Sequence, residues 1–130
     1  MSECCCGSDD QIKLLYACSG AANTGYLADS VSRRLAGFGI GKMTCMAAMG
    51  AGLSGIVESA RAAGENLVID GCPVACGKQM FENLGIPFRH FVTTDYAVEK
   101  GKTEITPELI GKTANALAEE IAGGCDCTAG

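Results

Sequence analysis

The stretch VIDGCPVACGKQ (68–79) decides the fold, because a buried strand turns there into a helix. The apolar run NLVIDGC (66–72) predicts a short strand, and VACGKQMFENLG (74–85) predicts a helix that ends at Gly85. Pro73 is suited to the first turn of that helix. Core packing does not require two thiols at such a turn, so the question is what these sulfurs hold or attack.

The same succession of strand, glycine-containing loop and helix repeats along the chain. The apolar runs are IKLLYAC (12–18), GKMTCMAAM (41–49), NLVIDGC (66–72) and FRHFVTTD (88–95). Helical spacing follows the first three runs, and Pro107 marks the first turn of a last helix. This alternation predicts an α/β protein, a three-layer α/β/α sandwich with about four mainly parallel strands, of the Rossmann or flavodoxin-like kind.

Length, charge and composition exclude several classes of protein. The chain has 130 residues, a hydrophobic fraction of 48% and a formal net charge of -5. We expect one domain over 11–122, with flexible ends at 1–10 and 123–130.

The negative net charge argues against nucleic acid or a membrane surface as partner. The start MSECCCGSDD lacks the basic and apolar segments of a secretory signal, which predicts a cytoplasmic protein.

The cysteine content points to metal or thiol chemistry. Nine cysteines in a small chain of expected cytoplasmic location do not form a disulfide framework, because the number is odd and that compartment keeps thiols reduced. Five of them stand near the two ends, where the sequence does not assign them a role. These are Cys4, Cys5, Cys6, Cys125 and Cys127.

The four internal cysteines share a position at the carboxyl ends of the expected strands. Cys18 ends the first strand, Cys45 lies late in the second, Cys72 ends the third, and Cys76 lies about one turn into the next helix. With the strand order 2-1-3, these ends converge within ~10 Å. Four thiolates suit a closed zinc site or a four-iron cluster, and the spacing does not separate the two.

Each thiol also has a plainer interpretation as a small buried hydrophobe. For Cys45, between Thr44 and Met46, burial as a small hydrophobe and a role as metal ligand are equally favoured. For Cys72 and Cys76 we favour a shared role, because both are expected near the first turn of a helix and on one face of it.

Other features suggest alternatives of less weight. GAGLSG (50–55) matches a dinucleotide fingerprint, with Asp70 as its acidic residue, but we interpret it as a tight turn and expect no nucleotide cofactor. His90, the single histidine, is interpreted as structural or surface-exposed. Lys42 or Lys78 could offset the negative charge of a thiolate site, although each also suits an ordinary surface position.

Three blocks together carry a family resemblance. CSGAANTG (18–25), GKMTCMAAMGAGLSG (41–55) and IDGCPVACGK (69–78) resemble the DGC domain family, with likeness over about 11–121. The resemblance implies zinc binding through four cysteines, here Cys18, Cys45, Cys72 and Cys76. The chain departs from the family at Ala75, often acidic there, and at Gly77, where alanine is expected; neither position is a proposed ligand.

We therefore expect a metal-binding protein that holds zinc through these four cysteines and whose reaction is unknown. The alternative is an enzyme that uses a 4Fe-4S cluster or a thiol pair in sulfur transfer or redox chemistry. The expected partners are a metal ion and, for the alternative, a protein or a small sulfur-containing molecule. The oligomeric state is not written in the sequence.

Overall fold

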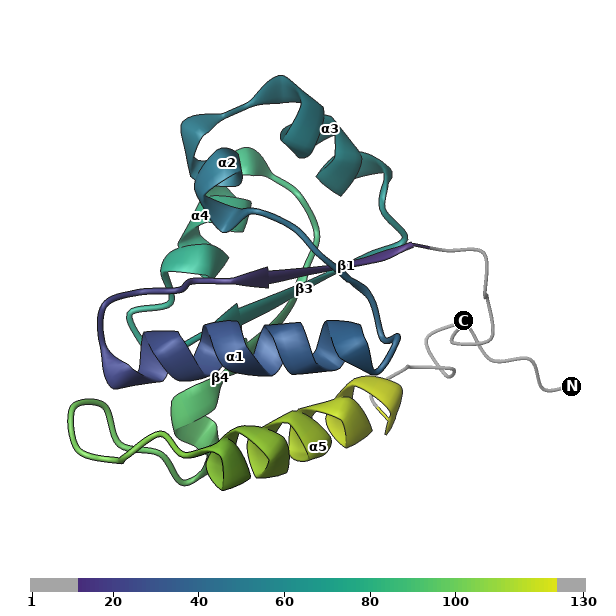
Figure 1. Ribbon diagram of the computed structural model, residues 1–130. Coiled ribbons are helices and arrows are strands. Elements are labelled where there is room, and N and C mark those ends of the chain that lie inside the picture. Colours follow the sequence, from purple (N-terminus) through teal and green to yellow (C-terminus); the bar gives the residue numbers. More distant parts are fainter. Residues whose placement is uncertain (1–11, 124–130) are drawn as a thin grey trace, which may run out of the picture.

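Four short strands form one parallel sheet in the computed structural model, which describes residues 12–123 (Figure 1). The strands are β1 (Lys13–Ala17), β2 (Lys42–Met43), β3 (Glu65–Asp70) and β4 (Arg89–Val92). Their order across the sheet is β2-β1-β3-β4, and all three pairs of neighbours are parallel. The predicted α/β class is thereby confirmed, and the first three strands have the 2-1-3 order on which the convergence of the cysteines depended.

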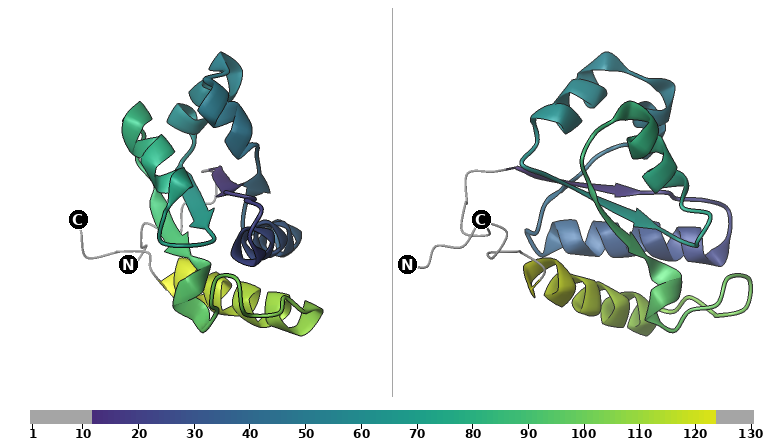
Figure 2. Two further views of the ribbon diagram at one scale, coloured as in Figure 1. Left: turned by 90° about the vertical axis from the view of Figure 1, so that its left-hand side faces the viewer. Right: turned by 180° about the vertical axis from the view of Figure 1, so that it is seen from behind.

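Helices cover both faces of this sheet, which gives the expected three layers (Figure 2). They are α1 (Asn23–Gly37), α2 (Met46–Ala51), α3 (Ser54–Ala62), α4 (Cys76–Leu84), the short 3-10 helix η2 (Thr93–Tyr96) and α5 (Pro107–Gly123). Helices α1 and α5 lie side by side on one face, whereas α2, α3 and α4 lie on the other (Figure 1). Pro107 begins α5, as predicted.

Two separate cores result, because successive residues of a strand point to opposite faces. Leu15 of β1 packs with the core of α1 and α5, while the next residue, Tyr16, packs with the core of α2, α3 and α4. In β3 the same division separates Ile69 from Val68. Burial raises the pKa of Tyr16 to about 12, and its hydroxyl donates a hydrogen bond to Asn66 Oδ1 at 2.9 Å.

The second strand is shorter than predicted. The apolar run 41–49 was expected to be a strand, but β2 spans only Lys42–Met43 and α2 begins at Met46. Alanine and methionine favour helix, and a short apolar run does not separate strand from helix by its periodicity. Cys45 therefore precedes a helix and does not lie inside a strand.

The helix after β3 begins later than predicted. Pro73 was expected in its first turn, but α4 begins at Cys76. A turn intervenes, in which the Ala75 N–H donates to the Cys72 carbonyl at 3.0 Å. Ala75 has a left-handed backbone with φ of 57°, which separates this turn from the helix. Gly85 ends α4 in a left-handed conformation, as predicted.

Within residues 12–123, no helix combines the length and the apolar character needed to cross a membrane. The predicted flexible ends lie outside the described residues apart from Gly123, which belongs to α5. The five cysteines near the chain ends lie outside them as well.

Candidate thiol site

A cavity of about 690 Å³ opens beside the carboxyl ends of β1 and β2. Its wall combines sulfur-bearing side chains with a small polar rim. The sulfur residues are Cys18, Met43, Cys45, Met46, Cys76 and Met80, and the rim residues are Ser19, Asp29 and Arg33. This is the edge of the sheet where ligands of open α/β sheets bind, as the position of the cysteines predicted.

Cys18 follows directly after β1 and is held by two contacts with the end of β3. Its N–H donates to the Ile69 carbonyl at 3.2 Å, and its Sγ accepts the N–H of Gly71 at 3.2 Å. Both contacts cross from one central strand to the other, so the sulfur is fixed at the centre of the sheet edge.

Gly71 allows β3 to end against the beginning of α1. A Cβ on Gly71 would lie 2.6 Å from backbone atoms of Thr24, which is closer than such atoms approach. On its other side, Thr93 Oγ1 donates to the Gly71 carbonyl at 2.8 Å. Glycine is therefore required here by packing.

Asp70 holds the beginning of α4. Its side chain is almost fully buried, and its carboxylate accepts the N–H of Gly77 at 2.8 Å and that of Lys78 at 3.1 Å. A carboxylate is favourable at a helix N-terminus, where backbone N–H groups lack partners within the helix. His90 Nε2 lies 2.7 Å from the same carboxylate, so of the two interpretations of this histidine, structural or surface-exposed, the contact favours the structural one.

These contacts also bear on the dinucleotide fingerprint. Asp70 is 1% exposed and already bonded on both oxygens, so it cannot reach a ribose hydroxyl. The glycine motif at 50–55 joins α2 to α3, with Gly52 left-handed at the end of α2, whereas a fingerprint joins a strand to a helix.

Cys45 and Cys76 each mark the beginning of a helix. Cys45 immediately precedes α2, and Cys76 is the first residue of α4. Both are exposed and line the cavity. The buried alternative for Cys45 is therefore wrong, and the physical reason is its place in a loop at the sheet edge.

Cys72 lies apart from the other three cysteines. It is half-buried in the turn between β3 and α4 and does not line the cavity. Its Sγ lies 3.5 Å from Nζ of Lys100, which belongs to the segment between η2 and α5. The expectation that Cys72 and Cys76 share one face of a helix is wrong, because only Cys76 is in the helix.

The cation at the cavity is Arg33 and not one of the two lysines considered in the sequence. Lys42 and Lys78 are both exposed, and neither lines the cavity. Arg33 Nε lies 2.8 Å from Asp29 Oδ2, and Ser19 Oγ donates to Asp29 Oδ1 at 3.0 Å. The hydrogen bond to Asp29, with its charge, raises the pKa of Arg33.

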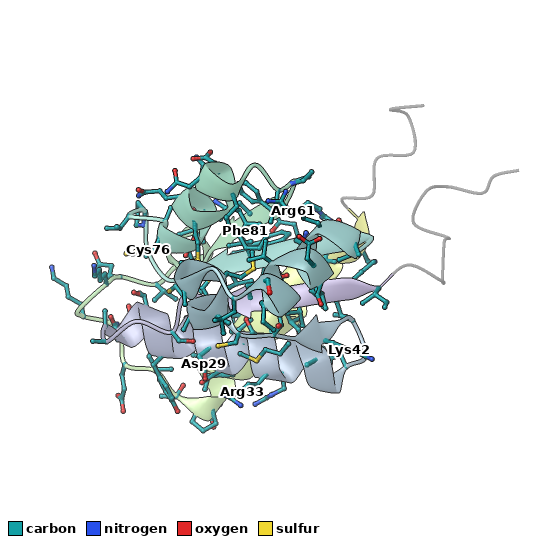
Figure 3. The ribbon with its side chains drawn as sticks, turned by 90° about the horizontal axis from the view of Figure 1, so that it is seen from above. Asp29, Arg33, Lys42, Arg61, Cys76 and Phe81 are labelled. Atoms are coloured by element: carbon teal, nitrogen blue, oxygen red, sulfur yellow. The ribbon has the colours of Figure 1, made fainter. Side chains whose placement is uncertain are left out.

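Figure 3 shows Asp29 and Arg33 on α1 and Cys76 on α4, so the cavity wall is built from both layers of helices. The spacing of four residues between Asp29 and Arg33 was a visible signal in the sequence. It resembles an ordinary surface pair on a helix, however, and did not single out either residue.

The four cysteines of the described residues are free thiols, and three of them share one cavity. As they stand, no three Cys, His, Asp or Glu side chains within 12–123 are close enough together to hold a metal ion. Thiols are suitable donors for zinc. To form a closed site, however, the cysteine side chains and the turn that carries Cys72 would have to move closer together.

These features define a three-layer α/β protein with free thiols at the carboxyl edge of a parallel sheet. A family model of the DGC domain matches residues 14–117, and the chain belongs to this family. The resemblance drawn from the three sequence blocks is thereby confirmed.

A relative of known name supports the same assignment. The chain is similar to the anaerobic and virulence modulator AnvM of Pseudomonas aeruginosa, with 32% identity over 93 residues. This region covers 71% of each protein. No solved structure matches the chain significantly.

Proposed function

We propose that this protein binds zinc through the thiolates of Cys18, Cys45, Cys72 and Cys76. One observation carries the proposal: Cys18, Cys45 and Cys76 come from three separate segments and line one cavity. Thiolates are preferred zinc ligands, and four of them make a closed site that suits structural stabilisation or metal handling.

Cys72 can complete the set by a local movement. It directly follows Gly71, whose N–H donates to Cys18 Sγ, so its backbone is already close to one ligand. To join the site, its side chain must leave Lys100 Nζ. Metal binding would thus release Lys100 and reorder the turn before α4.

The charge of the site is compatible with its surroundings. Four thiolates around a divalent ion leave about -2, which a partly buried site must offset. Arg33 at the cavity is paired with Asp29 and the two charges cancel, so the N–H groups at the beginning of α4, where Cys76 lies, are the source of the offset. A role in regulation is consistent with the name of AnvM, a modulator, since occupation of the thiols by metal could change the exposed turn around Cys72.

The test is metal analysis of the full chain prepared without oxygen. We expect one equivalent of zinc and protection of four thiols from alkylation. A variant with the five terminal cysteines changed to serine is the control and should keep its zinc, whereas Cys45→Ser should lose most of it. Less than about half an equivalent of zinc with the four thiols free contradicts the proposal.

A second candidate is an enzyme that uses an iron-sulfur cluster or reactive thiols. The observation that favours it is the cavity volume of about 690 Å³, which lies in the range of small-molecule sites. A brown protein with broad absorption near about 400 nm supports the cluster, and a colourless zinc protein excludes it.

A further inference from the structure

Cys18 differs from the two other cysteines that line the cavity. Cys45 and Cys76 are exposed, whereas Cys18 is half-buried directly after β1. Its Sγ accepts the N–H of Gly71 at 3.2 Å, and among the described residues no other cysteine sulfur accepts a backbone N–H. Such a hydrogen bond supports negative charge on the sulfur, and the thiolate is the nucleophilic form of cysteine.

The wall beside these thiols is apolar and polarisable. It includes the thioethers of Met43, Met46 and Met80. Methionine sulfur makes favourable contacts with aromatic and similar rings. The cavity volume of about 690 Å³ lies in the range of small-molecule sites, so a small planar ring system can enter it.

The polar rim of the cavity offers hydrogen-bond donors without net charge. Arg33 Nε lies 2.8 Å from Asp29 Oδ2, so the two charges cancel. Among the described residues, Arg33 forms hydrogen bonds only through Nε, and its side chain is 70% exposed. Its two terminal NH2 groups can therefore donate to a carbonyl oxygen. A neutral ligand with carbonyl groups suits this rim better than an anion does.

We propose that the cavity binds quinones, which are neutral, planar, unsaturated carbonyl compounds, and that Cys18 is the nucleophile that they modify. The methionine thioethers contact the ring, and Arg33 donates to a carbonyl oxygen. The inference rests on the second candidate of the proposed function and deepens it, because it gives the reactive thiols a class of substrate. It does not require zinc.

The reaction is a conjugate addition that consumes no further oxidant. The sulfur of Cys18 forms a bond to a ring carbon, the C=C π bond of that carbon breaks, and the π electrons move to the conjugated carbonyl oxygen. This oxygen takes up the proton that the thiol released to water, and the proton on the attacked carbon moves to the second oxygen. The product is a hydroquinone joined to Cys18 by a thioether, in which the ring is reduced and the sulfur oxidised.

The experiment compares two reagents on the reduced, metal-free full chain without oxygen, with serine at the five terminal cysteines. Iodoacetamide alkylates thiols largely by their accessibility, so it should modify Cys45 and Cys76 before Cys18. Menadione, a naphthoquinone, should instead modify Cys18 before any other cysteine. The rate at Cys18 should level off as the menadione concentration rises and the cavity fills. Mass spectrometry of peptides gives the rate at each cysteine.

Arg33→Met tests the recognition of the carbonyl group, because methionine has no donor. It should lower the menadione rate at Cys18 about tenfold and leave the iodoacetamide rates unchanged, which a merely structural effect would also alter. Arg61→Met is the matched control, since Arg61 lies on α3 and does not line the cavity; it should change neither rate. Circular dichroism verifies the fold of each variant.

Three results overturn the quinone site. They are the same order of modification for both reagents, a menadione rate at Cys18 that rises without levelling off, and an unchanged menadione rate in Arg33→Met. Zinc content is measured separately on the same chain. Bound zinc with any of these three results contradicts the quinone site alone, whereas selective modification of Cys18 in a chain that binds no zinc contradicts the zinc proposal alone.

Discussion

At the scale of single residues, the three members of the motif Asp70-Gly71-Cys72 have different roles. Asp70 bonds the first N–H groups of α4, and Gly71 provides close packing against α1 and an N–H for Cys18 Sγ. Cys72 lies at the surface turn beside Lys100. Two of the three residues thus position the cysteines, and only the third supplies a thiol.

Gly71→Ala should destabilise the protein by about 1–3 kcal/mol, because the added Cβ meets backbone atoms of Thr24 that cannot move independently of α1. Urea denaturation gives the free energy of unfolding. Gly55→Ala is the matched control: it lies in α3 with nothing within 4 Å of the new atom and should gain up to about 1 kcal/mol. Equal effects of the two substitutions would contradict the packing role of Gly71.

Asp70→Asn should lower the free energy of unfolding by about 1–3 kcal/mol, since an amide oxygen and an amide NH2 cannot both accept N–H groups. The N-terminus of α4 should also fray, so that Cys76 is alkylated faster in a mass-spectrometric time course. Glu119→Gln, an exposed change on α5, should stay within about 0.5 kcal/mol of the parent. An unchanged Cys76 rate would mean that Asp70 does not position this thiol.

At the scale of elements, the two misplaced boundaries have one physical origin. Helix α2 begins inside a run of alanine and methionine whose periodicity does not separate strand from helix, and α4 begins after the left-handed turn at Ala75; hydrophobic periodicity locates neither point. The sequence nevertheless predicted the end of α4 at Gly85 and the beginning of α5 at Pro107, because glycine readily adopts the left-handed conformation that ends a helix and proline has the fixed φ of a first turn.

Ala75→Gly tests the strain at the turn before α4. Glycine adopts the left-handed φ of 57° without the steric cost that alanine has there. We expect this gain to exceed the free energy that glycine loses through its greater conformational freedom in the unfolded chain. We expect a gain of about 0.5 kcal/mol in thermal or urea unfolding. Ala62→Gly, at the exposed right-handed end of α3, should instead lose about 0.5–1 kcal/mol, and losses in both variants would contradict the strain.

Asn23→Ala should release the segment between η2 and α5, because it removes three hydrogen bonds to that segment. Hydrogen exchange should quicken over 97–106, and Cys72 should react faster with a thiol reagent once Lys100 moves away. Asn115→Ala, an exposed position on α5, is the control and should change neither rate. Faster exchange spread evenly over the whole protein would indicate general destabilisation and not release of this segment.

At the scale of the whole molecule, the pattern of strands and helices sufficed to predict the layers, the parallel sheet and the edge where a site would lie. It also predicted three of the cavity residues, Cys18, Cys45 and Cys76, from their positions near the strand ends. It did not reveal that Cys72 turns toward Lys100, because that contact joins segments 28 residues apart in the chain through a loop without periodicity. The sequence did not predict that Arg33 lines the cavity, because α1 lies beside the loop of Cys45 only in the folded protein.

The two cores should unfold together, because β1 and β3 contribute alternate residues to both. Phe81→Leu in one core and Leu117→Ala in the other should each shift the whole transition, by about 1 and 2–5 kcal/mol respectively. Far-ultraviolet circular dichroism and tyrosine fluorescence, to which buried Tyr16 contributes, should give coincident curves for both variants. Leu53→Ala, at a 56% exposed position, should shift neither curve by more than about 0.5 kcal/mol. Separate transitions in Phe81→Leu would mean that the layer of α2, α3 and α4, which carries Cys45 and Cys76, folds and opens independently of the sheet that carries Cys18.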